Sequence, residues 1–140
     1  MSEVEIYNNL NNSLIATGLF FIGWSFLVWV AGRAVTIAIE NNAGIITKLV
    51  TTLFGLTAVW QFNNVLNFVP WNFAGAGHSL AILKNSGTEL SARSEAFLDM
   101  TGSTAAEVPQ FTIIPSDPIV LIFILSALYL VVGRLWVGNK

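Results

Sequence analysis

Four amide side chains fall within seven residues of a mostly apolar stretch, and they are Gln61, Asn63, Asn64 and Asn67. If this stretch lies in a membrane, each amide needs a hydrogen-bond partner, because an unpaired polar group in hydrocarbon costs several kcal/mol. Three interpretations stay open. The helix emerges at the membrane interface near Trp60, the amides bond to other helices, or they line a water-filled path or ligate a pigment or ion.

His78 is the single histidine of the chain, and there is no cysteine. One histidine cannot build a zinc site, and disulfides, thiolate metal sites and iron–sulfur clusters are excluded. The ligand role left for His78 is one axial bond to a haem iron or to a chlorophyll-type magnesium. The segment 74–78, AGAGH, resembles bacterial antenna helices over five residues, with an alanine four residues before the histidine. The stretch that follows soon reaches Lys84 and is too short to span a membrane, so a solvated or loop-packing histidine is the simpler interpretation.

Other chemistry is sparse. No acidic residue lies within a predicted span, which argues against a proton-carrying carboxylate of the rotor or pump type. A potassium-filter signature is absent, and pairing His78 with Ser79 or Asp99 gives no specific support for a hydrolase triad. We therefore predict no self-contained enzyme. The sequence requires no cofactor, and we expect bound lipid.

The elements that must position these groups are apolar helices. Hydrophobic residues make up 54% of the chain and charged residues 10%, against about 25% charged in soluble proteins. Residues 14–32 carry no charge, and nineteen helical residues at about 1.5 Å each nearly cover a hydrocarbon core of about 30 Å. We predict an all-α integral membrane protein with three transmembrane helices and a long extracytoplasmic loop that contains short amphipathic helices. The single membrane domain, 1–140, has spans at about 13–39, 45–67 and 118–137 and an outside loop at about 70–117.

Several residues mark the predicted helix ends. Asn11, Asn12 or Ser13 caps the first span by accepting a backbone N–H bond. Ser116 or Asp117 caps the third span, and Pro118 fits its first turn.

The predicted loop has patterning of its own. Pro70 begins it at an interfacial anchor, and residues 74–83 form a re-entrant or surface-lying helix. Residues 88–100 are helical in composition, with a broken apolar face made of Leu90, Phe97 and Met100.

Small residues recur on one face of each predicted span, where they let a neighbouring helix approach closely. In the first and third spans they are seven residues apart. The predicted helix-packing residues are Gly18, Ser25, Gly32, Thr51, Gly55, Ala58, Ser126 and Gly133.

The basic residues predict an orientation. Arg33 and Lys48 flank the first connection, and Arg134 and Lys140 follow the third span, whereas acidic residues dominate the lead and the loop. We expect the 40–48 connection and the C-terminus inside, with the N-terminus and the 70–117 loop outside. The expected location is a prokaryotic cytoplasmic membrane. Residues expected at the interface or on lipid headgroups are Arg33, Trp71, Arg134 and Trp136.

A net charge of −2 without a basic patch excludes nucleic-acid binding. The first hypothesis is a non-catalytic accessory subunit of a larger membrane complex of the oxidase, membrane monooxygenase, respiratory or photosynthetic type. Its partners are other membrane subunits and lipids. The first alternative is a homo-oligomeric channel or pore lined by the 61–67 amides. The second is a small pigment- or haem-binding subunit that uses His78.

Overall fold

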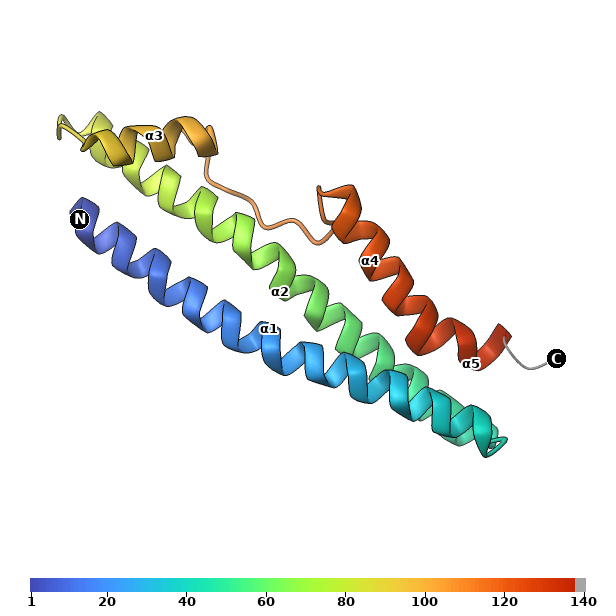
Figure 1. Cartoon of the computed structure of the whole chain (residues 1–140). Helices are drawn as coiled ribbons and strands as arrows, with labels where there is room; N and C mark the ends of the chain where they lie inside the picture. Colours follow the sequence, from blue (N-terminus) through green and yellow to red (C-terminus); the bar gives the residue numbers. More distant parts are fainter. Residues whose placement is uncertain (138–140) are drawn as a thin grey trace. The chain divides into compact units, whose positions relative to one another are not determined.

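The structure is a computed structural model that describes residues 1–137, and its regular elements are all helical over that range (Figure 1). Their bounds are α1 Glu3–Glu40, α2 Ile45–Asn85, α3 Ala92–Thr101, α4 Pro118–Leu128, a π-helical turn η1 Tyr129–Gly133, and α5 Arg134–Val137. Three helical stretches are long and apolar enough to cross a membrane: α1, α2, and the continuous run Pro118–Val137. This confirms the predicted all-α class with three candidate spans, and the three apolar helices suggest membrane insertion.

Helix α1 begins ten residues earlier than the sequence suggested, so the predicted cap at Asn11, Asn12 or Ser13 is wrong. The start is a capping box. The Ser2 backbone N–H donates to the Glu5 carboxylate at 2.7 Å, and the Glu5 N–H donates to the Ser2 hydroxyl at 3.4 Å. Since these two bonds satisfy N–H groups that a helix start leaves open, the polar lead folds as helix.

Helix α2 also exceeds its prediction, because it continues through Pro70 as far as Asn85. The predicted helix end near residue 67 and loop start at residue 70 are therefore wrong for the backbone. A proline removes one hydrogen bond from a helix interior, a local loss that packing elsewhere can offset. Here Ala76 and Leu80, beyond the proline, are buried in a core with residues of α1.

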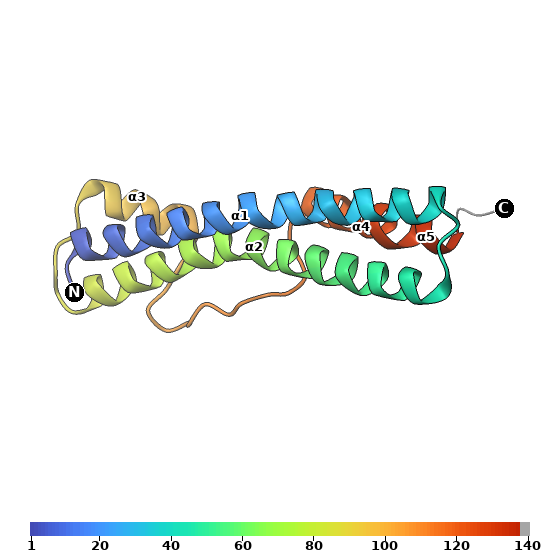
Figure 2. The ribbon, with the colours of Figure 1, turned by 90° about the horizontal axis from the view of Figure 1, so that it is seen from below.

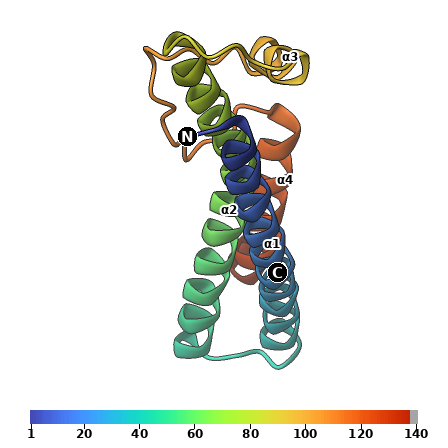
Figure 3. The same ribbon diagram turned by 90° about the vertical axis from the view of Figure 1, so that its left-hand side faces the viewer.

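The turn between α1 and α2 is short, as Figure 3 shows. Asn42 adopts the left-handed conformation with φ 48°, and the Ala43 N–H donates to the Ala38 carbonyl at 2.9 Å. Asparagine tolerates this conformation better than most residues, which explains how the helix is terminated here without a glycine.

Helix α3, Ala92–Thr101, begins inside the predicted 88–100 segment and ends one residue after it. Ser91 is the N-cap, and Gly102 ends the helix with φ 61°, a conformation that glycine adopts without strain. Leu90 is buried and Phe97 packs beside it, as the apolar pattern predicts, but Met100 is 67% exposed. Residues 102–117, seen as a trace without helix in Figure 2, connect α3 to α4.

Helix α4 confirms its predicted start: Asp117 is the N-cap, its side chain accepts the Ile119 N–H at 2.8 Å, and Pro118 opens the helix. The π-helical turn that follows was not foreseen. A Cβ on Gly133 would lie 2.7 Å from the ring of Tyr129, so the glycine lets that ring pack against the backbone.

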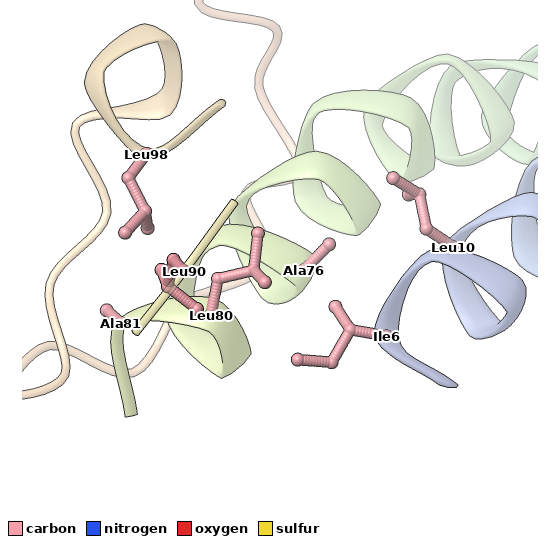
Figure 4. Close-up of a cluster of buried hydrophobic side chains, with 7 residues drawn as sticks. All are labelled: Ile6, Leu10, Ala76, Leu80, Ala81, Leu90 and Leu98. Atoms are coloured by element: carbon pink, nitrogen blue, oxygen red, sulfur yellow. The ribbon is translucent and has the colours of Figure 1, made fainter. Parts of the chain in front are cut away.

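The residue contacts gather in two compact units. Unit 1 comprises Met1–Gly18 and Asn67–Thr112, and its core, drawn in Figure 4, contains Ile6 and Leu10 of α1 and Ala76, Leu80 and Ala81 of α2 together with Leu90 and Leu98. Unit 2 comprises Leu19–Leu66 and the segment from Ile113 onward. The larger of its two buried clusters contains Ala31, Ala58, Val59, Phe62, Ile124, Ala127 and Val131.

Candidate functional site

The side chains of the four amide residues are buried or half-buried within the chain. Asn63 and Asn67 are 6% and 5% exposed, and Gln61 and Asn64 are half-buried. The Asn63 side-chain amide donates to the Ile113 carbonyl at 2.7 Å, and that of Asn64 donates to the Gln61 oxygen at 3.3 Å. Asn63 therefore fastens the segment that leads into α4, a partner that the sequence interpretations did not include.

An apolar groove of about 530 Å³ lies beside Asn63 within unit 2. Trp60 and Leu56 of α2 form one wall, and Leu121 and Ile124 of α4 form another. Ile113, whose carbonyl Asn63 holds, also lines it. The hydrogen bond thus shapes the end of this groove.

His78 is half-buried in unit 1, where its Nδ1 lies 2.7 Å from the Thr104 carbonyl oxygen. A carbonyl can only accept, so Nδ1 carries the proton and any cofactor bond would have to use Nε2. Gly77, the residue before it, has a structural use that the sequence motif did not reveal. A Cβ on Gly77 would lie 2.5 Å from the hydroxyl oxygens of Thr101 and Ser103, so the glycine admits the segment after α3. Cofactor binding by His78 stays a prediction.

The small residues of α2 are covered by the C-terminal helical run. A Cβ on Gly55 would lie 3.0 Å from the Val131 carbonyl oxygen, and Thr51 and Ala58 are both buried. Gly32 of α1 faces Val131 as well, at 4.0 Å. These positions pack closely within the chain, in the way a small-residue seam permits.

Of the remaining predicted helix-packing residues, Gly18 and Ser126 are exposed and Ser25 and Gly133 are half-buried, and a Cβ on Gly133 would lie 2.7 Å from the Tyr129 ring. A Cβ on Gly18 would meet no atom of the described residues within 4 Å. The hydroxyls of Ser25 and Ser126 bond within their own helices, to the Phe21 carbonyl at 2.6 Å and the Ile122 carbonyl at 2.8 Å. Their helix-packing role stays a prediction that needs a partner.

Arg33 and Arg134 line one groove of about 440 Å³ in unit 2. Among residues 1–137 the ion pair within 4.0 Å is Lys84 with Glu95, so neither arginine has a carboxylate partner there. The sequence noted their similar context, but only the fold brings them to one surface.

The two predicted interfacial tryptophans use their indole N–H groups inside the chain. Trp136 donates to the Thr52 hydroxyl at 2.9 Å, and Trp71 donates to the Pro109 carbonyl at 3.3 Å. Both residues are nevertheless exposed, Trp136 to 46% and Trp71 to 40%. Headgroup contact through their rings stays a prediction.

A carboxylate clamp in unit 1 escaped the sequence analysis. Glu3 accepts bonds from the Ser91 N–H at 2.9 Å, the Ser91 hydroxyl at 2.6 Å and the Ser94 hydroxyl at 2.5 Å. The hydrogen bond from the Ser91 hydroxyl, followed by that from Ser94, holds the pKa of this carboxyl below its ordinary value. No local signal could reveal a contact between residues 88 positions apart.

No family model, curated protein or solved structure matches this chain. Over residues 1–137 there is also no group of three or more His, Asp or Glu side chains arranged to hold a metal ion.

Proposed function

We propose that this chain is a non-catalytic structural subunit of a larger membrane complex, in which its apolar helices pack on other subunits. The observation that carries the proposal is the uncovered apolar surface of α1. In its most apolar window only 11% of the residues are buried within the chain, and Ile15, Ile22 and Trp29, which lie on the Gly18 side of the helix, are 64%, 68% and 64% exposed. Lipid can cover such a surface, but large side chains beside uncovered small residues also suit a partner helix.

The contrast between the small-residue faces supports a partner more specifically. Where α2 presents Thr51, Gly55 and Ala58, the chain's own C-terminal run fills the face. On α1 the corresponding face is occupied at Gly32, where a Cβ would lie 4.0 Å from Val131, but its other end, at Gly18, meets no atom of the described residues within 4 Å. We infer that a helix of another subunit takes that place.

The orientation with the 40–48 connection and the C-terminus inside belongs to the same proposal. Arg33, Lys48 and Arg134 lie at that end of their helices, and Lys140 lies outside the described residues. A prokaryotic cytoplasmic membrane is the expected location. The two alternatives, a pore and a pigment-binding subunit, are outcomes of the tests below. The burial of Asn63 and Asn67 inside the chain favours the subunit proposal over a pore lined by these amides.

The test is native mass spectrometry of the tagged chain, extracted gently from its own membrane, with an absorbance spectrum of the same sample. We expect larger, unlike chains at fixed stoichiometry. A ring of this chain alone would support the pore, and visible absorbance that disappears in His78→Ala would support the pigment subunit.

A matched pair of variants locates the contact. Gly18→Leu adds bulk to the proposed partner face, whereas Gly23→Leu adds the same bulk about 140° away on the same helix, at 100° per residue. A Cβ at either position meets no described atom within 4 Å, so neither variant strains the chain itself. We expect Gly18→Leu to release the partner chains and Gly23→Leu to retain them; equal retention would remove this face from the proposal.

A further inference from the structure

The groove that contains both arginines has two chemically different parts. Arg33 is exposed and Arg134 is half-buried, and no acidic side chain lines the groove. The other walls are mainly apolar, from Val28 and Trp29 of α1 to Phe123 and Leu130 of the C-terminal run. A surface that joins two cations to an apolar channel complements a molecule with an anionic head and a hydrocarbon tail.

The hydroxyl groups in the groove do not change this character. Thr36 donates to the Gly32 carbonyl at 3.1 Å, and Ser126 donates to the Ile122 carbonyl at 2.8 Å. Since both donors are used within their own helices, the wall between the arginines and Phe123 offers little polar chemistry to a ligand.

The groove also has the dimensions of one membrane leaflet. The C-terminal run and the second half of α1 pack together and proceed in the same direction, so both arginines lie toward the same end (Figures 1 and 2). From Phe123 to Arg134 is eleven residues, or about 16 Å at the α-helical rise. That is close to half of a hydrocarbon core of about 30 Å.

We propose that this groove binds one anionic phospholipid, with its phosphate at Arg33 and Arg134 and an acyl chain along the apolar wall toward Phe123. Guanidinium groups suit the ligand because they make paired hydrogen bonds to phosphate oxygens. The phosphate supplies the anion that the described residues do not. This inference does not depend on the proposed subunit role, because it concerns one chain and its lipid.

The test is native mass spectrometry of the full-length chain in mild detergent, titrated with phosphatidylglycerol, phosphatidylcholine or inorganic phosphate. We expect one phosphatidylglycerol per chain, bound in preference to phosphatidylcholine. Arg33→Gln and Arg134→Gln should each weaken that binding about fivefold and together about 25-fold, from the usual contribution of a basic residue to anionic-lipid binding. Lys48→Gln is the matched charge control and should change it less than twofold, because Lys48 does not line the groove.

A second variant separates a lipid from a free anion. Ser126→Phe keeps both arginines and fills the channel, so it should weaken phosphatidylglycerol binding and leave inorganic phosphate binding unchanged. Unchanged phosphatidylglycerol binding in this variant, with full competition by phosphate, would overturn the lipid site in favour of a free-anion site. Wild-type lipid binding by the double glutamine variant would also overturn it, and a protein partner lost in that variant would then assign the arginines to a carboxylate. Helical circular dichroism checks folding, and if the double variant is unfolded, Ser126→Phe and Arg33→Lys/Arg134→Lys decide.

Discussion

The interactions inside unit 1 differ in kind from those inside unit 2. In unit 1, side-chain hydrogen bonds join segments far apart in sequence, such as Glu3 to Ser91 and Ser94, and Asn72 to Thr17. The ion pair between Lys84 and Glu95 belongs there too. In unit 2 the packing is mainly apolar, with Gly55 against the backbone of Val131. The bonds from Asn63 to Ile113 and from Trp136 to Thr52 also join distant segments there, but no carboxylate or ion pair takes part in them.

The two units also differ in their numbers of basic and acidic residues. By sequence, unit 1 has two basic and six acidic residues, whereas unit 2 has four basic and two acidic residues. The charged residues of unit 2 lie at or beyond the ends of its apolar helices, and none lies within residues 19–32, 49–66 or 118–133. Hydrogen bonds between exposed groups add little net stability in water, while close packing of small residues is what holds helices together in lipid. The difference supports our proposal that unit 2 lies in hydrocarbon and unit 1 in a more polar environment.

Overpacking the seam of α2 should produce the largest loss of stability. Gly55→Leu places atoms where the Val131 carbonyl oxygen already lies 3.0 Å from a Cβ, and backbone cannot move aside as a flexible side chain can. We expect the free energy of unfolding to fall by about 1–3 kcal/mol. Denaturation in mixed micelles, followed by circular dichroism, measures it.

The control for that loss is Gly23→Leu, at an uncovered position of α1. It should unfold within about 0.5 kcal/mol of the parent, as surface substitutions usually do. Equal stability of Gly55→Leu and Gly23→Leu would contradict the view that unit 2 depends on close contact along α2.

In unit 1 the corresponding substitution should have a smaller and more local effect. Gly77→Val places a side chain against the hydroxyls of Thr101 and Ser103, which belong to an end of α3 and the segment after it. The two hydroxyls can rotate away, but the Cβ of Ser103, 2.8 Å from the added Cβ, can move only with its own segment, so we expect a local loss of about 1 kcal/mol. Hydrogen exchange should rise in residues 101–112 while the first half of α2 keeps its protection.

Gly75→Ala is the matched control, because a Cβ there meets no described atom within 4 Å. A small gain in helix stability is expected from replacing glycine by alanine. Should Gly77→Val leave residues 101–112 as protected as in Gly75→Ala, the close approach at Gly77 would not be what fixes this segment.

The sequence predicted those features that depend on composition and local signals. An uncharged apolar run predicts a long helix, and Asp117 before Pro118 predicts a helix start, because each signal acts on its immediate neighbours. The same reasoning stopped α2 at Pro70, where packing of Ala76 and Leu80 beyond the proline outweighs the lost hydrogen bond. It also overlooked the Ser2–Glu5 capping box, whose spacing was present in the sequence.

The long-range contacts could not be predicted from the sequence, for a different reason. Neither the Glu3 clamp nor the shared groove of Arg33 and Arg134 has a local pattern, since each joins segments that only the fold brings together. The segment AGAGH adds a similar case: its alanine four residues before His78 resembles the spacing in an antenna helix, whereas the close approach of the segment after α3 at Gly77 has no signal in the sequence.

The smallest predicted effect is that of low pH on the Glu3 clamp, which lies before the uncharged apolar stretch 14–32. The Ser91 and Ser94 hydrogen bonds lower the pKa of Glu3 from its ordinary value of 4.5, so the ionised carboxylate is the form that the folded clamp favours. Its contribution is therefore present at neutral pH and is lost as the pH falls through the lowered pKa. We expect the Ser91 and Ser94 amides to exchange faster, after correction for intrinsic rates, below that pH.

Glu3→Gln should remove this pH dependence, because an amide cannot ionise, and should give faster exchange at Ser91 already at neutral pH. Glu89→Gln changes a nearby exposed carboxyl outside the clamp and serves as its control. If Glu3→Gln retained the acid-induced change, another group would have to hold α3 against α1, and unit 1 would depend less on hydrogen bonds than the comparison with unit 2 implies. If only Glu89→Gln abolished it, the titrating group would lie in the turn before α3 instead.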